Sequence, residues 1–203
     1  MTSRLFLHFF LALLAIPAFA ADGDDAMFGL RWGMTVAEVK SAGVALTKTS
    51  GDRNLELYKT LSVPRNVSDF ESYQMIFADG KLAKIVGFSK DISNDPSGSS
   101  GKERFETLRS ALEKKYGKPN INSQTIGNKV FEEYDEFYEC LNYSGCGLWG
   151  SVFESVDKRT SIELKGLSRG TGYIEITAEA KPQWAQALKV YNSRKNSSDK
   201  DAL

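Results

Sequence analysis

The sequence predicts an α+β domain, an antiparallel sheet built from hairpins with helices packed on one face. Two observations lead to this class. Strand patterns follow one another across tight turns instead of alternating with helices, and the helical segments each carry one apolar face. We find no internal repeat and expect one domain over residues 21–192, a length that also allows two small halves meeting near 117–127.

The N-terminus has the pattern of a cleavable signal peptide over residues 1–20. Arg4 precedes an apolar run from Leu5 to Ile16, and Pro17 and the sequence Ala-Phe-Ala follow. An uncleaved membrane anchor is the alternative, but about a dozen apolar residues are too few to span a bilayer as a helix. We therefore expect export to the periplasm or the medium, with no stable membrane insertion after cleavage.

The first half of the predicted domain is rich in strands. A short strand at 28–32 leads into Thr35 and Glu38, the spacing of a capping box, and Gly43 ends the short helix that follows. Further strands are expected at 44–49, 54–61, 70–78 and 81–89. Asp79-Gly80 is a favoured hairpin turn between the last two. In that hairpin Tyr73, Met75 and Phe77 share one face, and Leu82, Val86 and Phe88 share another, which Lys84 interrupts.

The second half mixes helices and strands. A capping box at Ser100 and Glu103 predicts a helix whose buried face carries Phe105, Leu108, Leu112 and Tyr116. We expect another helix over 128–141, then strands near 147–156, 160–167 and 172–180. A last helix begins at Pro182 and aligns Trp184, Leu188 and Tyr191, and residues 193–203 are expected to form a flexible polar tail.

Composition excludes several kinds of chemistry. The only histidine, His8, lies within the expected signal peptide, so the remaining chain has none. Ser-His-Asp and Cys-His catalysis and His-ligated zinc are therefore excluded. Without Arg4 the chain keeps 25 basic and 26 acidic residues. This balance lacks the clustered positive charge that binding of nucleic acid usually requires.

Cys140 and Cys146 are the two cysteines, and in an oxidising compartment we expect them to form a disulfide. Gly145 gives the intervening segment the freedom to turn. A redox-active pair is the alternative, but the spacing differs from Cys-x-x-Cys.

Candidate binding residues are charged. Glu132, Glu136 and Glu139 form a row on the helix expected at 128–141, which would meet a basic partner or form an ordinary solvated face. Arg169 lies at the tip of a polar turn, where it would bind a partner's carboxylate or only complete the hairpin. No catalytic residue, metal ligand set or cofactor motif is assigned.

Residues 28–39, Phe-Gly-Leu-Arg-Trp-Gly-Met-Thr-Val-Ala-Glu-Val, resemble the strand, Gly-Met-Thr/Ser turn and short helix of outer-membrane assembly lipoproteins and of β-lactamase-inhibitor-like domains. Residues 135–141 and Cys146-Gly147 are similar to uncharacterised secreted bacterial proteins. The resemblance implies an α+β envelope protein whose sheet or loops bind another protein. It assigns no active-site residues.

These observations favour a protein that binds a protein partner in the cell envelope, with an inhibitor or immunity role as the most concrete form. Two alternatives stay open. The first is a hydrolase that uses two carboxylates on an envelope glycan, a chemistry that needs no histidine. The second is an envelope protein that binds a small ligand between sheet and helices.

Overall fold

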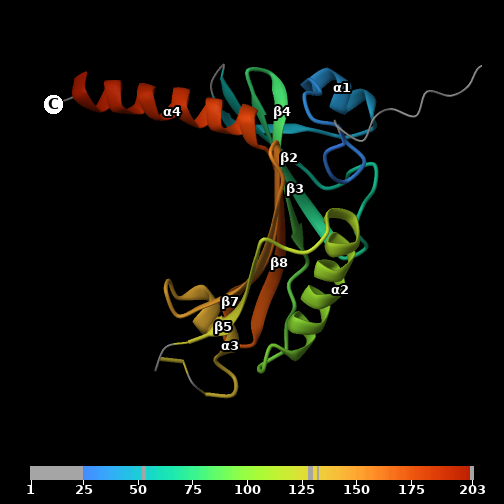
Figure 1. Cartoon of the computed structure of the whole chain (residues 1–203), viewed down its shortest axis with the longest axis vertical. Coiled ribbons are helices and arrows are strands. Elements are labelled where there is room, and N and C mark those ends of the chain that lie inside the picture. Colours follow the sequence, from blue (N-terminus) through green and yellow to red (C-terminus); the bar gives the residue numbers. More distant parts are fainter. Residues whose placement is uncertain (1–24, 52–53, 128–129, 132, 202–203) are drawn as a thin grey trace, which may run out of the picture.

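Eight antiparallel strands form one sheet in the computed structural model, which describes residues 25–51, 54–127, 130–131 and 133–201. The strand order is β1-β2-β3-β4-β8-β7-β6-β5 (Figure 1), and the predicted α+β class with a hairpin-built antiparallel sheet is confirmed. The strands are β1 Thr47–Gly51, β2 Leu55–Thr60, β3 Phe70–Ala78, β4 Lys81–Ser89, β5 Ile121–Ile126, β6 Gly147–Glu154, β7 Lys158–Ser168 and β8 Thr171–Ala180. The helices are α1 Val36–Ser41, α2 Ser99–Tyr116, α3 Phe137–Asn142 and α4 Lys181–Asp201.

The sheet consists of two four-stranded meanders, β1–β4 and β5–β8. Their last strands, β4 and β8, pair with each other and join the meanders edge to edge. A helix precedes each meander, α1 the first and α2 the second, and α3 is inserted between β5 and β6. The chain passes from one meander to the other through residues 90–98. The segment 117–127 lies inside the second half, where it leads from α2 into β5.

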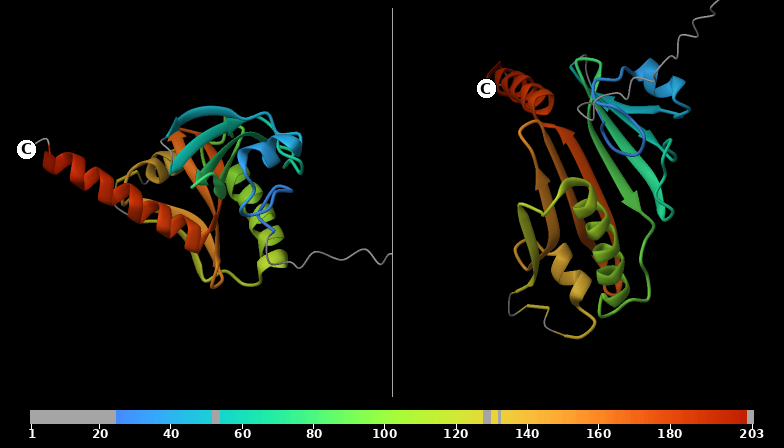
Figure 2. Two further views of the ribbon diagram at one scale, coloured as in Figure 1. Left: turned by 90° about the horizontal axis from the view of Figure 1, so that it is seen from above. Right: turned by 45° about the vertical axis from the view of Figure 1, so that its right-hand side comes forward.

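One face of the sheet is covered and contains the core. In β7 and β8 every second residue is buried, among them Ile162, Leu164, Ile174 and Ile176. The helices α2 and α3 lie side by side over these strands (Figure 2). The predicted apolar face of α2 is confirmed, because Phe105, Leu108 and Leu112 are buried against this core and Tyr116 packs at its margin.

The hairpin of β3 and β4 follows the prediction closely. Tyr73, Met75 and Phe77 are fully buried, and the Asp79-Gly80 turn has positive φ at both positions, as its residue types favour. The register slips by one residue between Ile76 and Phe77. This irregularity turns Leu82 to the covered face while Lys84, Val86 and Phe88 face the other side.

Two sequence-based expectations about helices are wrong. The helix expected over 128–141 forms only as α3, Phe137–Asn142, and Phe131 has a left-handed φ of 63° that a continuous helix does not allow. Residues 128–129 and 132 of that segment lie outside the described residues. The capping box at Ser100 and Glu103 is absent, because α2 begins at Ser99 and the carboxylate of Asp95 binds the N–H of Gly101. The capping box at Thr35 and Glu38 is confirmed.

The disulfide between Cys140 and Cys146 is confirmed and connects the end of α3 to the start of β6, with 5.1 Å between the two Cα atoms. Tyr138, two residues before Cys140, lies in a cradle of three glycines. A Cβ at Gly101 or Gly172 would fall 2.2 Å from the Tyr138 side chain, and one at Gly166 would fall 1.7 Å from the Tyr138 carbonyl oxygen. These contacts fix α3 to the sheet.

The last helix differs from the others because it crosses one end of the opposite face (Figures 1 and 2). Ala187 packs against Ala78 and Ala83, whereas Leu188 and Tyr191 of the aligned row are exposed. The helix continues to Asp201 through the region expected to be a polar tail. Among the described residues, no helix is long and apolar enough to cross a membrane.

Candidate functional site

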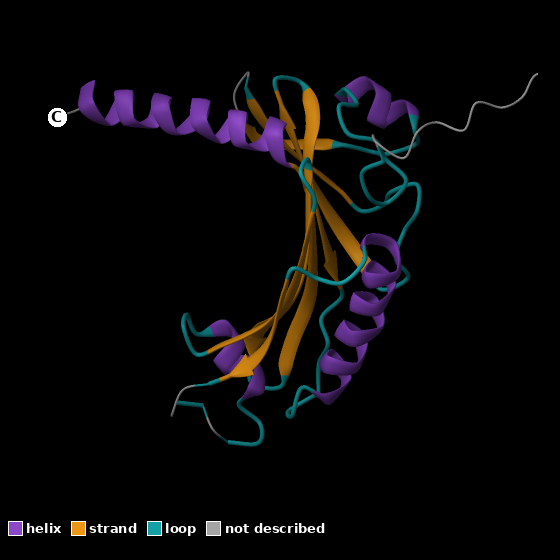
Figure 3. Cartoon of the chain, viewed as in Figure 1, coloured by secondary structure: helices purple, strands orange, loops and turns teal. Residues whose placement is uncertain are grey.

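The face of the sheet opposite α2 and α3, named the open face, carries no helix over its middle within the described part of the chain. The sheet curves toward it, between α4 at one end and β5 at the other (Figure 3). The strand register aligns side chains in rows across the two meanders: Phe88, Glu175 and Glu163 form one row, and Val86, Thr177 and Ser161 form the next. The rows cross the β4–β8 joint, so each combines residues of both halves.

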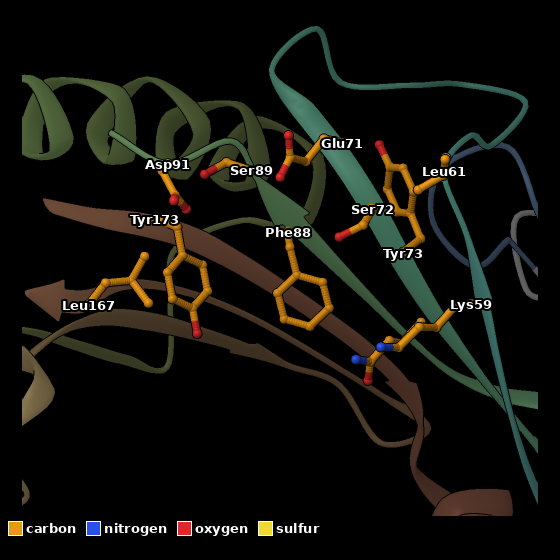
Figure 4. A pocket seen from close by; sticks show the side chains of 11 residues that line it. Lys59, Leu61, Glu71, Ser72, Tyr73, Phe88, Ser89, Asp91, Leu167 and Tyr173 are labelled. Carbon is orange, nitrogen blue, oxygen red and sulfur yellow. The ribbon is translucent and has the colours of Figure 1, made fainter. Parts of the chain in front are cut away.

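A hollow of about 530 Å³ lies on this face where the two meanders meet. Two aromatic rings, Phe88 from β4 and Tyr173 from β8, lie side by side in it with their centroids 6.2 Å apart (Figure 4). Leu167, 43% exposed, and Leu61, 78% exposed, contribute apolar walls. Large apolar side chains that stay exposed around an aromatic pair are typical of binding surfaces.

The rim of the hollow carries charges that have no ion pair within the described part of the chain. Glu71 and Asp91 line it, Glu175 flanks it, and Lys59 lies on its far side (Figure 4). Burial, followed by the nearby carboxylate of Glu175, raises the pKa of Tyr173. The amine of Lys165, which lies opposite Tyr173 and forms an ion pair with Glu163, also acts on this end of the hollow. Three carboxylates against the amines of Lys59 and Lys165 leave the rim slightly acidic.

The open face continues from the hollow toward α4 as a polar groove of about 340 Å³. Glu163 and Glu175 stand directly opposite each other on β7 and β8, an arrangement that destabilises a sheet unless a cation lies nearby. Lys165 forms an ion pair with Glu163. At the end of the groove the Lys84 amine lies 4.7 Å from the centre of the Trp184 ring. The described residues contain no group of three or more metal-ligating side chains.

The candidate residues found in the sequence meet one another, away from the hollow. Arg169, at the turn between β7 and β8, donates to Asp135 at 3.0 Å, Glu136 at 2.8 Å and Glu139 at 3.4 Å. Glu132 lies outside the described residues. Arg169 thus ties the β7–β8 turn to the residues around α3, and its contact with a partner stays a prediction.

Asp95 is used inside the chain. Its carboxylate, 4% exposed, accepts hydrogen bonds from the Gly101 N–H at 3.0 Å, the Tyr138 hydroxyl at 2.8 Å and the Ser99 hydroxyl at 3.1 Å. Burial raises the pKa of Asp95, but these hydrogen bonds outweigh burial and hold the pKa below its usual value. This carboxylate fixes the start of α2 and the position of α3.

Sequence reasoning missed the residues of the hollow. Phe88 appears in the sequence as one more apolar strand residue, and Tyr173 and Glu175 as the polar side of a half-buried strand. The signal that could have identified this face is Lys84, which interrupts the apolar pattern of β4. A lysine between Leu82 and Val86 indicates that this side of a central strand is open.

No protein-family model, curated protein or solved structure matches this chain.

Proposed function

We propose that this chain is an exported protein that binds another protein through the open face and seats a basic side chain of that partner in the hollow between β4 and β8. The observation that carries the proposal is the half-buried Phe88–Tyr173 pair, which lies beside carboxylates without an ion pair in the part of the open face away from α4. Export to the periplasm or the medium is supported by the signal-peptide pattern of residues 1–20 and by the Cys140–Cys146 disulfide.

The chemistry of the hollow favours a cation. The faces of Phe88 and Tyr173 are electron-rich and attract an ammonium or guanidinium group, an interaction of about 0.5–2 kcal/mol. Asp91 and Glu175 would form charge-assisted hydrogen bonds to the same group. Arginine fits both features, because its planar guanidinium stacks on rings and binds carboxylates in pairs.

The rest of the open face suits a protein surface better than an isolated small ligand. Its rows present hydroxyl, carboxylate, amine and aromatic groups over several strands, the mixture that surrounds the centre of protein interfaces. The curvature of the sheet toward this face would receive a convex partner (Figure 1). An inhibitor or immunity protein that covers the working surface of a toxin or hydrolase in the same compartment is the most specific form of the proposal.

Face-specific crosslinking tests this function. A photoreactive amino acid is placed at Ser161, in the middle of the open face, and in a matched variant at the exposed Lys114 on α2. In cells that make the protein at its natural level, we expect one defined crosslinked species from Ser161 and none from Lys114. Identical products from both positions, or none from Ser161, would overturn the proposal.

The role of the hollow has its own test on the crosslinked partner. Asp91→Asn and Glu175→Gln each remove one carboxylate without changing side-chain size, and both should weaken binding of the partner on the order of tenfold. Glu103→Gln, on the exposed part of α2, is the control and should bind normally. If the hollow variants bind like the control, the partner does not place a cation there.

A further inference from the structure

The two free edges of the sheet differ in a way that is independent of the open face. The edge strand β1 carries Lys48, and its register with β2 is irregular between Lys48 and Ser50. Charges and bulges of this kind protect an edge from pairing with another chain. The opposite edge strand, β5, lies in the segment 120–127, which contains no charged residue and no proline, and β5 pairs with β6 in unbroken register.

The unprotected edge is also the most apolar part of the exposed surface. Six of the eleven large apolar side chains that are exposed among the described residues lie between positions 121 and 148, although this segment is a small part of the chain. They are Ile121, Ile126, Val130, Tyr134, Tyr143 and Leu148. Exposed apolar groups beside an open strand edge favour the addition of another strand, since main-chain hydrogen bonds and apolar burial then act together.

We propose that β5 pairs with β5 of a second copy of this chain, antiparallel and around a two-fold axis at Ser123. In an antiparallel pair whose two-fold axis is perpendicular to the sheet, residues opposite each other lie on the same face of the sheet. The axis must therefore run between the two copies of one and the same residue. Ser123 is near the middle of β5 and lies on the same face as Gly150, its partner in β6. Gln124 is less suited, because its amide bonds to Glu106 of α2.

This register matches apolar groups across the joint. Ile121 of one copy would lie opposite Thr125 of the other, and Thr125 is already the partner of Leu148 in β6. An uncharged row of side chains would therefore run from one sheet into the next. It would consist of Leu148 and Thr125 of one copy and Ile121 of the other. Asn122 would face Gln124 of the second copy. The Asn122 amide nitrogen can donate to the Gln124 amide oxygen, while the Gln124 nitrogen keeps its bond to Glu106 and the Asn122 oxygen keeps its bond from Ser151.

A second copy fits this edge better than a foreign strand. A foreign strand is selected by pockets for its side chains or by complementary charges, and the residues of β5 are uncharged and nearly all exposed. In a two-fold pair every residue of β5 meets the same sequence, so the absence of charge removes the repulsion that would otherwise oppose self-association. The pair would join two eight-stranded sheets and present two open faces.

A charge-swap experiment on the chain 21–203 tests the proposal by sedimentation velocity over a range of concentrations. The unchanged chain should dimerise reversibly, and Ser123→Lys or Ser123→Glu should each weaken dimerisation on the order of tenfold, because equal charges would meet at the axis. An equimolar mixture of the two variants should recover the dimer. Thr47→Lys, on the exposed edge strand β1, is the matched control and should dimerise like the unchanged chain.

Circular dichroism and the melting temperature of each variant establish that the monomers are folded. A chain that remains monomeric at every concentration overturns the proposal. So does a dimer that survives both substitutions at Ser123, or one that Thr47→Lys weakens equally. The mixture that recovers the dimer is the decisive outcome, since misfolded variants would not restore each other. Loss of the open-face crosslink would leave this result unaffected, so the two proposals fail separately.

Discussion

Replacing Tyr138 by phenylalanine removes one hydroxyl from the place where α2, α3 and the sheet meet. Phenylalanine fits the same glycine cradle, so packing is retained while the hydrogen bond to Asp95 at 2.8 Å is lost. Asp95 is 4% exposed, and water therefore has little access to replace the missing donor. A hydrogen bond to a buried charged group contributes about 1.5–3 kcal/mol, and we expect the free energy of unfolding to fall by that amount.

Urea unfolding followed by far-UV circular dichroism measures the change, and a loss of about 2 kcal/mol should lower the melting temperature by about 4–8 °C for a chain of this size. Tyr134→Phe is the control, since Tyr134 is 76% exposed. Equal unfolding midpoints for the two variants would refute the view that the Tyr138–Asp95 bond holds the two helices in place.

The pH dependence of the same variant gives an independent check. Hydrogen bonds hold the pKa of Asp95 below its unfolded value of about 3.9, so the stabilisation is fully present above that value and is lost as pH falls through the lower folded pKa. Tyr138→Phe removes one of these bonds and should raise the folded pKa of Asp95. The stability of the variant should then depend less on pH on the acid side than that of the unchanged chain.

Three further predictions concern other contacts. Cys140→Ala with Cys146→Ala should lower the free energy of unfolding by about 2 kcal/mol, the closure term of so short a loop, and a melting curve that does not respond to reductant would contradict this. Gly172→Ala should destabilise by about 1–3 kcal/mol or more in urea unfolding, because the new methyl would fall 2.2 Å from the Tyr138 ring; a neutral effect would mean that the cradle adjusts freely. Arg169→Ala should lower stability slightly at low salt and not at high salt, since Arg169 is half exposed and its three ion pairs are screened; an effect of equal size at high salt would point to packing instead.

The sequence was most informative where local patterns and the final fold agree. The Asp79-Gly80 hairpin, the apolar face of α2, the three strands of residues 147–180 and the disulfide all follow from periodicity, turn chemistry and cysteine spacing. These features depend on neighbours in the chain, so a local pattern contains most of the information that determines them.

It was least informative where distant residues determine the local structure. Residues 128–141 have an amphipathic pattern, yet within the described part of this segment only Phe137 to Leu141 are helical. Arg169 of the distant β7–β8 turn binds Asp135, Glu136 and Glu139 around the start of this helix. The strand β5, Ile121–Ile126, was missed because its residues alternate weakly and are nearly all exposed. Asp95 accepts hydrogen bonds from the start of α2 and from Tyr138 of α3. Asp95 and Tyr138 are 43 positions apart, so no short sequence motif predicts their contact.

The hollow illustrates why the open face could not be predicted from the sequence. Phe88 ends the first meander and Tyr173 begins the last strand of the second, and the two rings meet because β4 pairs with β8. Each meander alone would expose one of these strands as an edge, with half of the hollow on it. The joint that completes the sheet therefore also assembles the site, and a substitution that loosens the β4–β8 pairing should disturb the fold and the open face together.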